Sequence, residues 1–99
     1  MWKRAIVKLG DSALSITGIS FNKLQIKANV GNSNKMVTIN ISKEALATTI
    51  DKFNGGWYRT PTDNCGISFN ASMSIINIDT AYLNGTNVLS NTYWIVLYR

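Results

Sequence analysis

The strict alternation of apolar and polar residues between Lys23 and Val30 is the feature that most constrains the fold. Its apolar positions are Leu24, Ile26, Ala28 and Val30, and its polar positions are Lys23, Gln25, Lys27 and Asn29. Side chains alternate between the two faces of a strand, so the pattern predicts one face on a core and one in solvent, as in antiparallel sheets. Residues 35–41 alternate in the same way after the turn residues 31–34, which predicts a hairpin.

Most of the remaining chain also has a period of two, and one segment has a helical period. We expect further strands at about 2–9, 14–19, 67–75 and 92–99, and Asn84-Gly85 is a strong hairpin signal. Residues 93–98 are apolar on both faces, which predicts a central strand or one whose second face meets another subunit. The expected fold is a single α+β domain over residues 1–99, mostly β, with about seven strands in an antiparallel sheet, small barrel or sandwich, and one helix at about 43–53.

The helix prediction rests on capping and periodicity. Ser42 is a suitable N-cap, and Glu44 lies in the first turn, where a carboxylate is favoured. Apolar and small residues gather on one side of the helix at positions 45, 46, 49, 50 and 53, and residues 54–56, Asn-Gly-Gly, suit a C-cap. A helix of this length is too short to persist alone, so we expect it to pack on the sheet.

The inventory of reactive side chains argues against catalysis. The chain has no histidine, one cysteine and five carboxylates, which excludes the usual zinc sites and histidine-based acid–base pairs. Cys65 has no partner for a disulfide and no histidine to deprotonate it. We therefore expect no enzyme activity, no metal and no cofactor; a carboxylate pair of Asp63 and Asp79 is the remaining catalytic hypothesis.

Residues 57–64 form the first candidate binding site, for a protein or a glycan. Two glycines precede this segment, and Pro61 with the polar residues after it predicts a loop. Aromatic rings beside an arginine can stack on a ligand, and the polar side chains can hydrogen-bond hydroxyl groups. The candidate contact residues are Trp57, Tyr58, Arg59, Asp63 and Asn64. The alternative is that Trp57 and Tyr58 begin a strand and pack in the core.

Basic residues in the N-terminal half form an alternative site for an anion or nucleic acid. The net charge is +5, and only 15% of the residues are charged. The alternative site residues are Lys3, Arg4, Lys8, Lys23 and Lys27. This asymmetry is typical of an electrostatic footprint for phosphate, although lysines also protect strand edges from aggregation. The residues 23–29 include no aromatic side chain that would stack on a base.

The last third of the chain resembles bacteriophage tail-fibre and other virion-associated β modules. The resemblance lies in residues 82–89, Tyr-Leu-Asn-Gly-Thr-Asn-Val-Leu, and in the closing segment 93–99, Tyr-Trp-Ile-Val-Leu-Tyr-Arg. It implies a host-surface or virion-assembly role, often as a trimer, and it assigns no functional residue. The N-terminal part departs from such proteins because it has no fibrous repeat or attachment segment, so the chain would be a stand-alone module or an excised domain.

The distribution of apolar residues predicts a soluble protein that is made in the cytoplasm. Residues 1–10 lack the apolar core of a signal peptide. The longest apolar-dominated run, residues 93–98, is far shorter than the ~20 residues that a membrane-spanning helix needs. Virion association is the more specific expectation that the tail-fibre resemblance adds.

Overall fold

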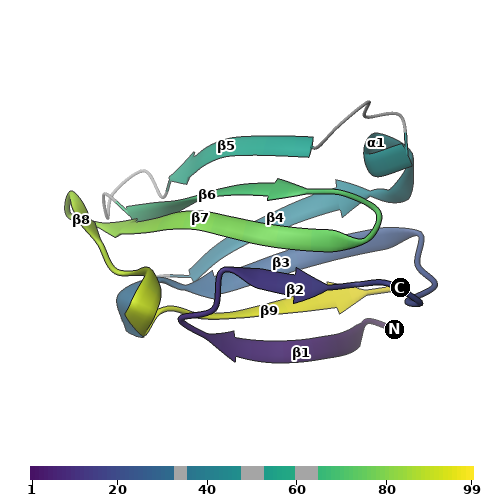
Figure 1. Ribbon diagram of the computed structural model, residues 1–99, viewed down its shortest axis with the longest axis horizontal. Helices are drawn as coiled ribbons and strands as arrows, with labels where there is room; N and C mark the ends of the chain where they lie inside the picture. Colours follow the sequence, from purple (N-terminus) through teal and green to yellow (C-terminus); the bar gives the residue numbers. More distant parts are fainter. Residues whose placement is uncertain (33–35, 48–52, 60–64) are drawn as a thin grey trace.

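The chain forms two antiparallel β-sheets in a computed structural model that describes residues 1–32, 36–47, 53–59 and 65–99 (Figure 1). For residues 5–8 and 53–59 only the backbone is described. The four-stranded sheet has the order β1 (Lys3–Leu9), β9 (Tyr93–Tyr98), β3 (Lys23–Asn29), β4 (Met36–Ser42). The five-stranded sheet has the order β2 (Ala13–Ser15), β7 (Ile75–Leu83), β6 (Cys65–Ala71), β5 (Phe53–Arg59), and β8 (Thr86–Asn87) pairs with β7.

The predicted hairpins and the predicted central strand are confirmed. β3 and β4 pair from Lys23 opposite Ser42 to Asn29 opposite Met36, and β9 lies between β1 and β3. Asn84 and Gly85 join β7 to β8, and both have the positive φ that this kind of tight turn requires. The mostly-β fold class is therefore correct, and the architecture is the sandwich among the alternatives.

The core fills the space between the two sheets. The four-stranded sheet buries Leu24, Ile26, Ala28, Val37, Ile39, Ile41, Trp94 and Val96, and the five-stranded sheet buries Leu14, Cys65, Ile67, Phe69, Ala71, Ile76, Ile78 and Ala81. These residues form one cluster. The alternation that predicted β3 and β4 is therefore the alternation between the core face and the outer face of one sheet.

The described part of the helix covers the first five residues of the predicted segment. α1 spans Lys43–Ala47, and the Ser42 hydroxyl accepts a hydrogen bond from the amide of Ala45 at 3.1 Å, so the predicted N-cap is confirmed. Residues 48–52 lie outside the described part of the chain. The predicted end at Phe53 is wrong because Phe53 begins β5, where it pairs with Ala71. Pairing with a distant strand here overrides the local periodicity.

A buried threonine joins the connections at one end of the sandwich. η1 (Val30–Asn32) follows β3, and η2 (Leu89–Asn91) precedes β9. The hydroxyl of Thr92 donates a hydrogen bond to the Val88 carbonyl at 2.9 Å and accepts one from the Gly31 amide at 3.0 Å. Thr92 is fully buried, so its side chain replaces water as the hydrogen-bond partner of both backbone groups.

Candidate functional site

The structure places the two predicted sites differently. Trp57, Tyr58 and Arg59 belong to β5, which pairs with β6 from Phe53 to Arg59, so the prediction that these three residues lie in a loop is wrong and the strand alternative is confirmed for the backbone. Asp63 and Asn64 lie outside the described residues. The side chains of residues 57–59 are also outside the description, so the first candidate site stays a prediction.

The second predicted site is gathered on the four-stranded sheet. Its residues come from β1 and β3, which are separated only by β9. Arg4, Lys23 and Lys27 lie on the outer face of this sheet. Their pairing partners across the strands are Leu97, Ser42 and Ile95, none of which is a core residue. Lys3 is exposed at the position opposite Tyr98, on the other face of the edge strand, and the side chain of Lys8 is outside the description.

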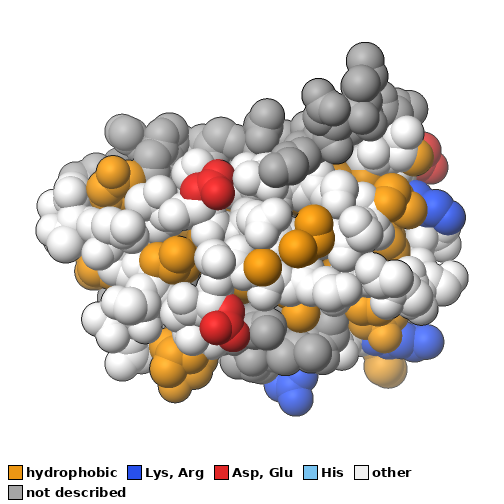
Figure 2. Space-filling view, viewed as in Figure 1, with side chains coloured by type: hydrophobic (Ala, Val, Ile, Leu, Met, Phe, Trp, Pro, Cys, Tyr) orange, Lys and Arg blue, Asp and Glu red, His pale blue; other side chains and the backbone are white. Residues whose placement is uncertain are grey.

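Charge is divided unequally between the two sheets. The strands of the four-stranded sheet contain five basic residues and no carboxylate, whereas the described strands of the other sheet contain one of each, Arg59 and Asp79. Figure 2 shows the side of the molecule on which β7 lies in front, and there the described Lys and Arg side chains appear only at the margin. Three of the five basic residues, Arg4, Lys23 and Lys27, lie on the outer face of the four-stranded sheet, so this face is positive.

One end of this outer face carries a row of exposed apolar side chains. Leu9 pairs with Tyr93, Tyr93 with Asn29, and Asn29 with Met36, so one row crosses all four strands. Leu9, Tyr93 and Met36 are 50%, 44% and 51% exposed, which makes them three of the five most exposed large hydrophobic side chains among the described residues. Clustering of this kind marks a contact surface more often than scattered exposure does.

Two residues of the apolar row, Met36 and Tyr93, line a surface hollow. The hollow has a volume of about 270 Å³, and its lining residues are Lys27, Asn29, Met36, Tyr93, Trp94 and Ile95. The side-chain oxygen of Asn29 is buried and accepts no hydrogen bond from the described residues. An unsatisfied buried acceptor costs about 1–3 kcal/mol.

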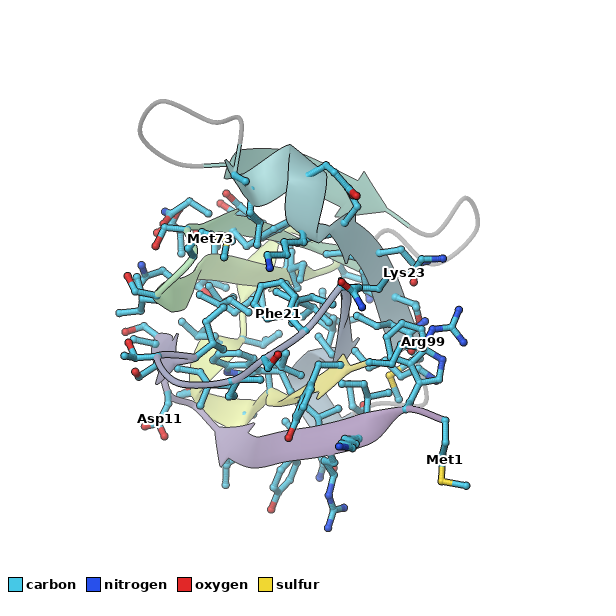
Figure 3. The ribbon with its side chains drawn as sticks, turned by 90° about the vertical axis from the view of Figure 1, so that its right-hand side faces the viewer. Met1, Asp11, Phe21, Lys23, Met73 and Arg99 are labelled. Carbon is cyan, nitrogen blue, oxygen red and sulfur yellow. The ribbon has the colours of Figure 1, made fainter. Side chains whose placement is uncertain are left out.

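The opposite end of the same face is basic and aromatic. The guanidinium carbon of Arg99 lies 4.5 Å from the centre of the Trp2 ring, a cation–π contact. Arg99 also exchanges two backbone hydrogen bonds with Lys23, of 3.0 and 3.1 Å, so the two residues are direct neighbours across the strands. Figure 3 shows Lys23 and Arg99 together on one side of the molecule, away from Asp11 and Met73.

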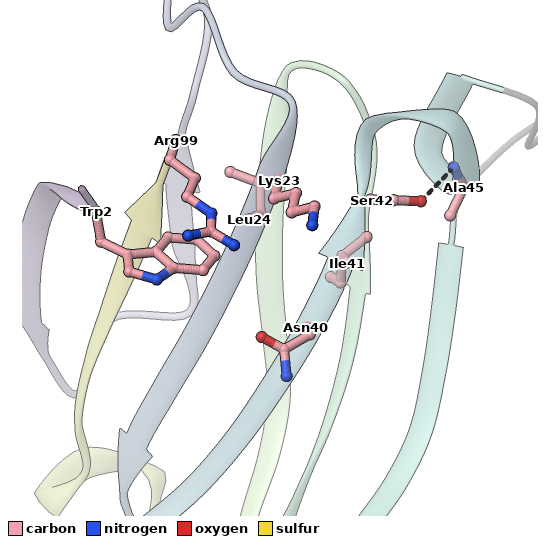
Figure 4. A pocket seen from close by; sticks show the side chains of 8 residues that line it. All are labelled: Trp2, Lys23, Leu24, Asn40, Ile41, Ser42, Ala45 and Arg99. Atoms are coloured by element: carbon pink, nitrogen blue, oxygen red, sulfur yellow. Dashed lines mark hydrogen bonds between the residues drawn. The ribbon is translucent and has the colours of Figure 1, made fainter.

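These residues line a surface pocket whose volume is about 450 Å³ (Figure 4). Its lining residues are Trp2, Lys23, Leu24, Asn40, Ile41, Ser42, Ala45 and Arg99. Two of them are cationic, Asn40 and Ser42 supply neutral polar groups, and none is a carboxylate. Such a lining suits an anionic group.

Sequence reasoning found part of this surface. It identified Arg4, Lys23 and Lys27. For the segment 93–98 it predicted a central strand or one whose second face meets another subunit; the central strand is confirmed, and the subunit contact stays a prediction. It missed Leu9, Met36, Trp2 and Arg99, which join the surface only because β9 lies between β1 and β3. The two-faced apolar pattern of residues 93–98 was the signal that could have found them.

Other kinds of site receive no support from the described residues. Among them, no group of three His, Cys, Asp or Glu side chains is placed to hold a metal ion. No helix in the described ranges is long and apolar enough to cross a membrane. Comparison of the chain with protein-family models, with curated proteins and with solved structures finds no match.

Proposed function

We propose that this protein is a noncatalytic binding or assembly module whose contact surface is the outer face of the four-stranded sheet. The observation that carries the proposal is the row formed by Leu9, Tyr93 and Met36 on a face with no carboxylate in its strands. An interface core rich in aromatic and methionine side chains with basic residues around it is typical of protein-binding surfaces. The partner is therefore a protein surface that is both apolar and acidic.

The charge of this face also constrains how copies of the chain could assemble. A symmetric face-to-face dimer would bring the positive charges of Arg4 and Lys27 against the same residues of the second copy, which is unfavourable. A ring in which this face meets a different surface of the next copy avoids that repulsion. A closed trimer of this kind would agree with the tail-fibre resemblance and with a role in a virion.

Two measurements test the proposal. Light scattering on a sizing column gives the mass in solution, and a random peptide library selected on the immobilised protein gives the preferred chemistry of the partner. We expect selected peptides that combine Asp or Glu with apolar residues. Met36→Ser and Tyr93→Ser should weaken their binding at least about tenfold, as for central interface residues.

Met73→Ser is the matched control. Met73 is also exposed, at 42% against 51% for Met36, but it lies in the turn between β6 and β7. Met73→Ser should leave the binding of the selected peptides unchanged. Peptides that bind the Met36→Ser and Tyr93→Ser proteins as tightly as the original protein would contradict the assignment of this surface.

Single-stranded nucleic acid is a second candidate for the same face. The observation that favours it is the position of Tyr93 and Trp2 beside the lysines of β3, because the sequence of β3 alone supplies no stacking residue. Anisotropy of a labelled oligothymidylate should then rise at low salt and fall as salt is added. Tyr93→Ser and Lys27→Gln should both weaken the binding of the oligothymidylate. If the oligothymidylate does not bind at low salt, this candidate is excluded.

A further inference from the structure

The pocket between Trp2, Lys23, Asn40 and Ser42 holds the cationic side chains of Lys23 and Arg99 side by side. Arg99 N–H donates to the Lys23 carbonyl at 3.1 Å, and Lys23 N–H donates to the Arg99 carbonyl at 3.0 Å. Residues that exchange both hydrogen bonds have Cα atoms about 5.5 Å apart, and their side chains project from the same face. Among the described residues, no Asp or Glu side chain lines the pocket.

The arginine is held in place by its surroundings. Its guanidinium group lies over Trp2 at 4.5 Å. Its carbonyl oxygen accepts hydrogen bonds from the amides of Asn22 and Lys23 at 2.7 and 3.0 Å. A guanidinium group that is stacked on an indole keeps its in-plane N–H donors free for an anion. Binding here would therefore need little ordering of the arginine.

Two neutral donors complete the lining. The side-chain oxygen of Asn40 already accepts a hydrogen bond from Gln25 at 3.0 Å, so its amide NH₂ is the group left for a ligand. The oxygen of Ser42 accepts from the Ala45 amide at 3.1 Å, so its hydroxyl hydrogen remains as a donor. Figure 4 shows Asn40 and Ser42 on β4, the strand next to β3, which carries Lys23.

We propose that this pocket binds the terminal phosphate of a phosphomonoester, held by Lys23 and Arg99 with Asn40 and Ser42 as further donors. A phosphomonoester carries nearly two negative charges at neutral pH and three acceptor oxygens, which matches two cations and two neutral donors. The anion also removes the repulsion between the neighbouring cations. This proposal does not rest on the protein partner proposed above, because a small anion can occupy the pocket by itself.

Titration calorimetry with phenyl phosphate and with inorganic phosphate tests the site. We expect saturable binding of phenyl phosphate that Lys23→Gln and Arg99→Gln each weaken at least about tenfold, as for loss of one charge-assisted contact. Lys3→Gln is the matched control, since it removes the same charge at an exposed position on the other face of β1 that does not line this pocket. It should change the affinity less than about twofold.

The source of the phosphate group is distinguished by an oligothymidylate with and without a 5′-phosphate. Tighter binding of the phosphorylated strand than of phenyl phosphate would assign the site to a strand end, and equal binding would assign it to a small phosphomonoester. If Arg99→Gln unfolds the protein, as judged by its circular dichroism, Lys23→Gln carries the test. The proposal fails if phenyl phosphate shows no saturable binding, or if Lys3→Gln weakens binding as much as Lys23→Gln does.

Discussion

Replacing Thr92 by valine removes one buried hydroxyl and changes little else in size. In the folded protein that hydroxyl satisfies the Gly31 amide and the Val88 carbonyl at 3.0 and 2.9 Å. Each buried backbone group left unsatisfied costs about 1–3 kcal/mol. Both of these backbone groups belong to partly buried residues, so a value below the middle of that range applies, about 1.4 kcal/mol for each group. The two groups together then cost about 2.8 kcal/mol, of which the added methyl group returns about 0.8 kcal/mol. We expect Thr92→Val to lower the free energy of unfolding by about 2 kcal/mol.

Urea unfolding followed by tryptophan fluorescence measures this change. For a domain of this size the midpoint should fall with an unchanged m-value, and the melting temperature should fall by roughly 10 °C. Thr92→Ser keeps both hydrogen bonds and loses one methyl group, so it should cost only about 1 kcal/mol. A change below about 0.5 kcal/mol for Thr92→Val, or a larger loss for Thr92→Ser, would refute the reasoning, since an unpaired buried group must cost more than that.

Three further changes are predicted from the same structure. Gly10→Ala should destabilise the protein more than Gly85→Ala does. Both glycines have positive φ, but only at Gly10 would the new Cβ lie 2.9 Å from a backbone oxygen. Gly85→Ala should cost about 1 kcal/mol, and thermal melts of the two variants rank them. Trp94→Phe removes the 2.8 Å hydrogen bond from the indole to the Asp11 carbonyl and leaves a void in the core, so urea unfolding should show a loss of about 2–4 kcal/mol. Cys65 is buried, so a thiol reagent should label it only in denaturant, and rapid labelling of the folded protein would contradict its place in the core.

The sequence predicted the fold where a single face is buried. Residues 23–30 and 36–41 alternate cleanly because successive positions face the core and the solvent in turn, so both the strands and their pairing follow from the pattern. The helix start was also predictable, since Ser42 caps it through a purely local hydrogen bond. Local sequence patterns therefore predicted the elements that local interactions stabilise.

The end of the helix and the binding surface could not be read in the same way. Phe53 continues the helical period, yet it pairs with Ala71, far along the chain. The surface likewise depends on strand order and register. Leu9 on β1 and Met36 on β4 are distant in sequence, but they lie in one row because β9 and β3 fill the two strand positions between them. The periodicity of a single sequence does not show which strands will be neighbours, because the order of strands in a sheet is set by the packing of the whole molecule.

The position of β9 between β1 and β3 also sets the order of events during synthesis. β1 and β3 are made well before β9, and the edges that β9 will pair remain without a partner until it arrives. The β3–β4 hairpin can form early because its pairing is local. Until β9 joins, the nascent chain exposes strand edges and the core faces of both sheets, which is the state most prone to aggregation. Chaperone binding to unfinished chains should therefore cease only once residues 93–98 are available.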